Sequence, residues 1–334
     1  MKKIFLTCLC ASLFAEGSPS TQFSIILGGG IQKLKSNIST QTKSFLQNYD
    51  VSQRDSFFFP LLGFEFDYQE SGHQIFLKNY NGRNLSGISM GYSKSYDTWK
   101  TTLKLISSLR EQAYENPYQI GDRNEIDVLK IALEITQDYR LGEYQRIFVS
   151  YLLANNLYEK ETMPFDALKR ESIMQQFEIG LDWTLVHINA FVDYNNAEGS
   201  AETFGRVGFE LGGFWKFEND VVLSPNMSVA RQIASNKNPI FDAKNNATIL
   251  QISLNLTKLQ LFNQPNLFGY AHYGFENRHS EISFLNESFS NFLLGVGFRS
   301  KIIINTHTRA LLPKPAHMWG EATTKTLYDR AHAT

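Results

Sequence analysis

Apolar and polar residues alternate along most of this chain with a period of two. In the segment 290–302, Phe292, Leu294, Val296 and Phe298 occupy every second position. Because successive side chains of a strand point to opposite faces, such a row predicts a β-strand with one apolar face. Segments of about ten residues repeat this pattern about a dozen times between 23 and 302.

The length of these segments favours a membrane barrel over a soluble protein. Transmembrane β-strands need about 9–11 residues, whereas strands of soluble proteins usually have about 5–6. The connections also alternate between short ones (70–72, 141–143, 219–220) and long ones (110–124, 155–171, 235–246). Short periplasmic turns and long outer loops produce this asymmetry. We therefore predict an all-β fold, a transmembrane antiparallel up-and-down β-barrel; a periplasmic β-sandwich is the alternative.

The number of strands follows from the length of the barrel region. Roughly 290 residues at an ordinary repeat predict about 12 strands, with 10 and 14 as alternatives, because closure of the sheet favours an even number. No turn is evident between 173–183 and 186–194, so these segments form either two strands or one long bent strand.

Aromatic residues gather near the ends of the predicted strands. Amphipathic aromatic rings favour the boundary between lipid and water. The residues that we assign to this boundary are Tyr68, Trp99, Tyr139, Trp183, Tyr194, Trp215 and Phe217.

The two ends of the chain lie outside the barrel region. Lys2 and Lys3 precede a short apolar run that ends at Ala15, which is typical of a secretory signal peptide. We therefore predict a signal peptide at 1–15, an outer-membrane barrel at 16–304 and a C-terminal tail at 305–334, either periplasmic or disordered. Phe298 is the natural last residue for a closing strand, which leaves the extension beyond it unexplained.

Composition agrees with an exported strand protein. Hydrophobic residues make up 43% and charged residues 19%, and the mean hydropathy of −0.27 shows that apolar residues are dispersed. No segment has 18 consecutive apolar residues. Both cysteines, Cys8 and Cys10, lie in the predicted signal peptide, so we expect no disulfide. A net charge of −1 gives no indication of a nucleic-acid partner.

The polar rows of the strands are candidates for the inner wall. A charged residue at the lipid-facing midplane costs about 2–4 kcal/mol, so charges on the strands are expected to face the lumen. They form either a bracing salt-bridge network or a polar pathway in which bases oppose acids across the pore. The candidate pore-lining residues are Lys100, Lys104, Arg110, Lys130, Glu134, Arg146, Glu178, Asp182, Arg206, Glu210 and Arg231.

The segment Asn116-Pro-Tyr-Gln-Ile-Gly-Asp-Arg-Asn-Glu-Ile-Asp127 resembles a signature of a domain-of-unknown-function family of Gram-negative exported proteins, whose members are thought to be outer-membrane barrels. The resemblance implies an outer-membrane location and no activity. The corresponding loop-motif residues are Pro117, Tyr118, Gly121, Arg123, Glu125 and Asp127.

Read from the residues alone, this motif is a structured loop. Pro117 fixes the backbone and Gly121 permits a turn, while Arg123 is placed to clamp Glu125 or a carboxylate of a neighbouring strand. The loop either folds back over the barrel mouth or contacts a ligand and narrows the pore.

Catalytic and metal-binding patterns are weak in this sequence. His279 and Ser280 are adjacent, flanked by Glu276 and Glu281, but neighbours on a strand point to opposite faces. No pair of histidines has the spacing of a local metal site, and Gly28-Gly29-Gly30 lacks the lysine of a phosphate loop. We predict no enzyme activity, no cofactor and no metal.

The leading functional interpretation is a porin-like channel for passive diffusion of small hydrophilic solutes in the outer membrane of a Gram-negative bacterium. A plugged barrel with a structural or surface-interaction role through its long loops is the alternative, and a lipid-modifying enzyme is a distant third. The expected partners are outer-membrane lipid, the outer-membrane assembly machinery and small solutes, with no nucleic acid.

Overall fold

A computed structural model describes residues 19–50, 52–109, 111–142, 145–183 and 185–303. The predicted signal peptide and the tail at 305–334 therefore lie outside the described residues. Within the described ranges, no helix is long and apolar enough to cross a membrane.

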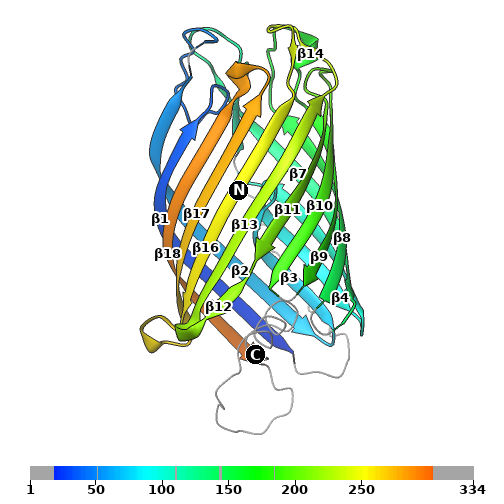
Figure 1. The fold of residues 1–334 in the computed structure, drawn as a ribbon, viewed down its shortest axis with the longest axis vertical. Coiled ribbons are helices and arrows are strands. Elements are labelled where there is room, and N and C mark those ends of the chain that lie inside the picture. Colours follow the sequence, from blue (N-terminus) through cyan, green and yellow to red (C-terminus); the bar gives the residue numbers. More distant parts are fainter. Residues whose placement is uncertain (1–18, 51, 110, 143–144, 184, 304–334) are drawn as a thin grey trace, which may run out of the picture.

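The chain forms one antiparallel sheet that closes on itself (Figure 1). Its strands are β1 (Ser20–Lys35), β2 (Arg54–Glu70), β3 (His73–Asn81), β4 (Ser86–Ser95), β5 (Trp99–Ser108), β6 (Glu111–Tyr114), β7 (Glu125–Arg140), β8 (Gln145–Tyr158), β9 (Ser172–Trp183), β10 (Val186–Ala197), β11 (Phe204–Gly213), β12 (Trp215–Phe217), β13 (Val221–Ala234), β16 (Ala247–Leu259), β17 (Leu267–Ser280) and β18 (Glu287–Ile303). The connections hold β14 (Lys237–Asn238), β15 (Ala243–Lys244) and the 3-10 turns η1 (Asp166–Leu168), η2 (Glu218–Asp220), η3 (Leu261–Asn263) and η4 (Ser283–Leu285).

Consecutive strands pair around the ring, and β1 closes it by pairing with β18. Because β5 and β6 both pair with β7, and β11 and β12 both pair with β13, each couple occupies one position in the ring. The barrel therefore has 14 strands.

The prediction of about 12 strands is wrong, and 14 is the upper value of the predicted range. The doubtful region at 173–194 is two strands, β9 and β10, which pair with each other from Trp183↔Val186 onward. A connection of only two residues leaves no polar segment in the sequence, and such short connections allow more strands in the same length of chain.

The outer surface of the barrel is apolar. On β18 and β1, the outward rows meet in register, with Phe298 opposite Ile25 and Phe292 opposite Ile31. Large exposed apolar side chains continue this belt around the ring, among them Leu133 on β7 and Phe209 on β11. A closed sheet with such a belt satisfies its backbone internally and is solvated by lipid outside. The chain is a transmembrane β-barrel.

The two rims of the barrel differ in their connections. Ser20 and Ile303, the ends of the closing pair, lie at the rim of the short turns, which include Ser71-Gly72. The long connections lie at the opposite rim, where β14 is labelled in Figure 1. By the usual asymmetry, the first rim is periplasmic and the second extracellular. The periplasmic rim carries aromatic residues, including the stacked pair Tyr96 and Trp99, whose ring centroids are 3.9 Å apart.

Depth in the belt determines the cost of an outward charge. Leu133→Arg is expected to destabilise the barrel by about 2–4 kcal/mol, because it buries a guanidinium in the hydrocarbon layer. Ile233→Arg, at the outward penultimate residue of β13, is the control, with an expected cost of about 0–1 kcal/mol. Urea unfolding of both variants in lipid vesicles measures the difference. Equal costs at the two positions would contradict the placement of the belt.

Candidate functional site: the lumen and the cap

The inward rows line a polar cavity of about 870 Å³. It runs from the periplasmic rim, at Ser20, Asp97 and Lys301, to the turn that holds Arg83. Acidic and basic side chains both line it, so the cavity is a hydrated space of mixed charge.

Nine of the predicted pore-lining residues lie on the inner face. Six line the cavity itself: Lys100, Lys104, Glu134, Arg146, Glu178 and Glu210. The other three pair with luminal partners: Asp182 with Arg146, Arg206 with Asp193, and Lys130 with Glu111. Arg110 lies outside the described residues.

Arg231 departs from the prediction, because it lies on the outer face of β13. It shares its row with the exposed Val229 and Ile233, and its guanidinium contacts Thr248 and Glu281. The physical reason is position: at the rim, the cost of an outward charge falls to about 0–1 kcal/mol. The cost that orients a mid-strand charge inward therefore does not apply to Arg231.

Most luminal charges pair with a neighbouring strand. Lys104 on β5 contacts Glu134 on β7 at 2.6 Å. Arg146 on β8 lies between Asp138 and Asp182, at 3.0 Å from Asp138. In these described pairs, acidic and basic side chains lie side by side on neighbouring strands, as in a bracing network.

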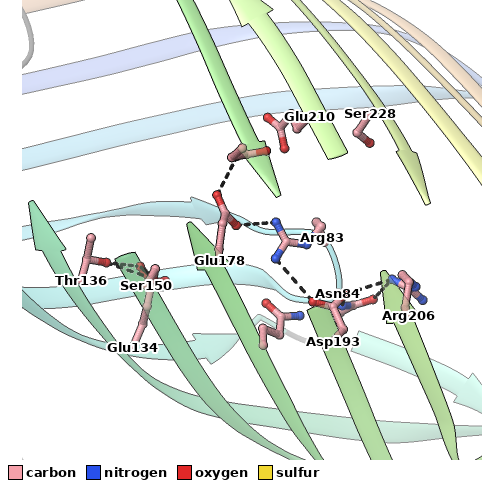
Figure 2. A network of polar contacts seen from close by, with 12 residues as sticks. Arg83, Asn84, Glu134, Thr136, Ser150, Glu178, Asp193, Arg206, Glu210 and Ser228 are labelled. Carbon is pink, nitrogen blue, oxygen red and sulfur yellow. Dashed lines mark hydrogen bonds and ion pairs between the residues drawn. The ribbon is translucent and has the colours of Figure 1, made fainter. Parts of the chain in front are cut away.

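One connection crosses the lumen. The β3–β4 turn (82–85), which we call the crosspiece, folds inward, and Figure 2 shows Arg83 directed at Glu178 and Asp193 on β9 and β10. The distances are 2.5 Å to Glu178 and 3.4 Å to Asp193. Asp193 is fully buried and is also contacted by Arg206 at 3.5 Å and by the Asn84 amide at 3.2 Å. The turn is thus fixed to strands four to six positions away in the ring.

An apolar contact fixes the other side of the crosspiece. Leu85 is buried against inward side chains of the wall, among them Ile106 and Leu152. The Arg83 guanidinium also stacks over the Phe191 ring at 3.9 Å. A cation over an aromatic face adds about 0.5–2 kcal/mol, more when it is desolvated. The crosspiece is therefore held to the wall on two sides, by Arg83 at β9 and β10 and by the packing of Leu85.

The extracellular mouth is closed by a second structure, which we call the cap. Six long connections meet there: 36–50, 115–124, 159–171, 198–203, 235–246 and 281–286. They share one apolar cluster around Leu46, Leu168 and Phe284, all almost completely buried. Tyr49 and Phe241 pack on the Phe284 ring with centroids 5.4 and 5.5 Å away. Because these connections come from all around the ring, their common core covers the mouth.

Arg123 of the loop motif holds two of the cap connections together. It is buried, and it donates to the backbone carbonyls of Ser44 at 2.9 Å, Lys43 at 2.8 Å and Asn37. It also stacks on the Tyr114 ring at 3.9 Å. The prediction that Arg123 clamps a carboxylate is therefore wrong. Carbonyl oxygens of 36–50 take that place, because the loop packs on backbone and not on a charged strand.

The other motif residues divide between the cap and the wall. Gly121, at φ +97°, pairs through its backbone with Leu46, and the Pro117 carbonyl accepts a hydrogen bond from Arg123. Tyr118 is buried in the apolar cluster. Glu125 and Asp127 are exposed on β7. The motif thus forms a loop folded over the mouth.

One carboxyl group is enclosed by the cap. The Tyr118 hydroxyl donates to Glu202 at 3.3 Å. Burial raises the pKa of the Glu202 carboxyl, and the positive charge of Arg170 acts in the opposite sense. Burial also raises the pKa of the Tyr118 hydroxyl. Burial thus shifts the pKa of both groups in the same direction.

The two residues considered for catalysis, His279 and Ser280, lie on opposite faces of β17. His279 is exposed on the outer side of β17, while Ser280 is buried and bonded to Asn245 at 3.0 Å. Within the described ranges, no group of three or more His, Cys, Asp or Glu side chains could hold a metal.

Sequence reasoning missed the crosspiece and its buried partner. Asp193 lies in the inward row of β10, and the outward row of Ile188, Val192 and Tyr194 would have identified its face. Arg83 and Asn84 occupy a short turn between two strands of 9 and 10 residues. The brevity of these two strands is the only available signal.

A family model with the description "Protein of unknown function (DUF2860)" matches residues 21–299. The chain belongs to this family. The resemblance based on 116–127 is confirmed by this match. Comparison with curated proteins gives no match.

Solved structures of outer-membrane proteins resemble the chain. OmpT, an outer membrane protein of Vibrio cholerae, is 10% identical with a TM-score of 0.44, over 87% of this chain and 100% of that one. An anion-selective porin from Comamonas acidovorans is 9% identical with a TM-score of 0.42, over 84% and 100%. OprD from Pseudomonas aeruginosa is 6% identical with a TM-score of 0.40, over 85% and 96%.

The location of the DUF2860 chain follows from its own strand pairing and surface. Single-chain barrels with an even number of antiparallel strands and an apolar belt are typical of bacterial outer membranes. The protein resides in the outer membrane of a Gram-negative bacterium.

Proposed function

We propose that this barrel is a gated, porin-like channel for small hydrophilic solutes, closed in this structure at its extracellular mouth. The observation that carries the proposal is the polar cavity of about 870 Å³ between the periplasmic rim and the crosspiece. Its charged side chains of both signs solvate polar solutes, whether these are positive or negative. No covalent chemistry is assigned to it.

Two barriers lie along the proposed path. The crosspiece divides the lumen at Arg83, and the cap covers the outer mouth. Loops that pack through a small apolar core open at lower free energy than the barrel wall, because they contribute few of the backbone hydrogen bonds. Movement of the cap is therefore the gating step of the proposal.

The alternative is a permanently plugged barrel with a surface role. The cap favours it, because six connections share a buried apolar core. In this case the lumen is a braced interior and solutes do not cross.

Planar-bilayer conductance of the refolded protein separates the two functions. The channel proposal predicts infrequent openings of the wild-type protein and frequent openings of variants with a weakened cap, such as Phe284→Ala. The matched control is Phe209→Ala, which removes a similar ring from the lipid-facing surface. Absence of current in both the wild-type protein and the cap variant would overturn the channel and leave the plugged barrel.

A further inference from the structure

Part of strand β2 has an unpaired edge among the described residues. β2 pairs with β1 along residues 54–69 but with β3 only along 65–70. Along 54–64, no strand of the described chain pairs on the β3 side. β2 is exposed accordingly: Phe58 is 70% and the adjacent Phe59 36% accessible, although their side chains lie on opposite faces.

The gap arises because the β3–β4 hairpin is short and its turn folds inward. β3 ends at Asn81 and β4 begins at Ser86, and the crosspiece between them reaches Glu178 and Asp193 in the lumen. On the far side of the gap, β6 pairs only with β7. In the ring, β2 and the β5–β6 position are three strand spacings apart, each of about 4.8 Å. Beyond the end of the β3–β4 hairpin, no strand of the described chain occupies the space between them.

The cap borders this gap at its extracellular end. The Tyr114 hydroxyl of β6 donates to the Thr42 carbonyl at 3.2 Å, and Leu46 pairs with Gly121. This gap in strand pairing, which we call the window, is thus framed by β2, the end of the β3–β4 hairpin, β6 and the segment 36–50.

The sequence of β2 is adapted to an open edge. The Phe64 amide donates to the Asn79 side chain at 2.6 Å, so amides of residues 60 and 62 point to the same side. Residue 60 is proline, which has no N–H and which occurs in sheets at edges. Pro60 therefore removes one donor that would have no partner strand.

The window lies at the depth of the bilayer. Phe58 pairs with Ile31 and Leu62 with Leu27, four outward residues of the apolar belt. The inward residues of the same stretch are Phe57, Phe59 and Leu61, so β2 is apolar on both faces here. Irregular or unpaired backbone at this depth is tolerated where it lines a water-filled cavity.

From this geometry we infer that the window is a lateral portal between the lumen and the bilayer for amphipathic molecules with one apolar chain. The apolar chain of such a molecule crosses the edge of β2 along Phe58, Phe59 and Leu62. Its polar end remains with the charged side chains of the lumen. The portal uses the lumen of the proposed channel but bypasses its cap, so the two functions can fail separately.

Fluorescence quenching tests whether acyl chains reach the luminal side of β2. A fluorophore is attached at Phe59→Cys, or at Leu61→Cys as a second position, with Cys8 and Cys10 replaced by serine, in vesicles that contain lysophosphatidylcholine brominated on its chain. Ser253→Cys, on the inward face of β16, is the luminal control, and Leu294→Cys is the lipid-facing reference.

The portal predicts about threefold more quenching at residue 59 or 61 than at residue 253, approaching that at 294, since only the first two border the window. Quenching at both positions equal to that at residue 253 would overturn it. Sedimentation as a dimer together with protection of residue 59 would also overturn it, because a second copy would then pair with the β2 edge. A heat-modifiable gel mobility like that of the wild type shows that each variant is folded.

Discussion

Replacing Arg123 by alanine is expected to open the extracellular mouth. The buried guanidinium donates to carbonyls of two cap connections, and hydrogen bonds to charged groups contribute about 1.5–3 kcal/mol each. Their loss frees 36–50 from 115–124 and leaves buried carbonyl oxygens unsatisfied. The cap then opens at equilibrium while the strands, which are bonded to one another, remain paired.

The measurement is the open probability of single channels in planar bilayers. We expect an increase of at least about tenfold, which corresponds to about 1.4 kcal/mol, less than one of the lost hydrogen bonds. Arg231→Ala is the matched control, because this arginine is exposed at the same rim and contacts the cap only through an exposed ion pair with Glu281. An Arg123→Ala protein that is folded but has wild-type gating would contradict the assignment of the cap as the gate.

Replacing Arg83 by alanine is expected to cost more stability than any other luminal substitution. It removes the partner of Glu178 and one of the two arginines at the fully buried Asp193. Asp193 keeps Arg206, but Glu178 loses its ion-pair partner, and leaving a buried charge without its partner typically costs about 3–5 kcal/mol. The crosspiece also loses its hold on the far wall, so the conductance of open channels should rise.

Urea unfolding in vesicles and single-channel conductance provide the two measurements. Lys78→Ala is the control, because Lys78 is also luminal but lies 3.9 Å from Glu65, with both side chains partly exposed. Such pairs contribute about 0–1 kcal/mol. A cost for Arg83→Ala no larger than that of Lys78→Ala would show that the crosspiece is not held by its ion pairs.

The sequence predicts the faces of the strands because their physical cause is local. A period of two, together with the cost of a charge in lipid, is sufficient to orient Lys104, Glu134 and Glu178 inward. The same reasoning fails for Arg231, because depth in the membrane depends on strand tilt and length and not on alternation. The predicted number of strands was wrong for a related reason. A short connection such as that between Trp183 and Val186 leaves no polar segment in the sequence.

The functional elements that the sequence did not reveal depend on contacts across the ring. Arg83 meets Asp193, 110 residues later, only because β3 and β4 are short and their turn folds inward. Arg123 likewise holds Lys43 through a backbone carbonyl, which any residue type supplies. Neither contact has a signature in residue identity at a fixed spacing.

The pairing of β1 with β18 has a consequence for biogenesis. Ser20 lies opposite Ile303, so the seam joins the two extremes of the folded chain. Contacts of such long sequence separation form late and slowly, because the intervening chain must lose its freedom first. A chain cut short before Glu287 keeps β1 and β17 as open edges, and exposed edges of this kind template aggregation. The barrel can therefore be completed only after its last segment has been exported, and every earlier intermediate needs protection in the periplasm.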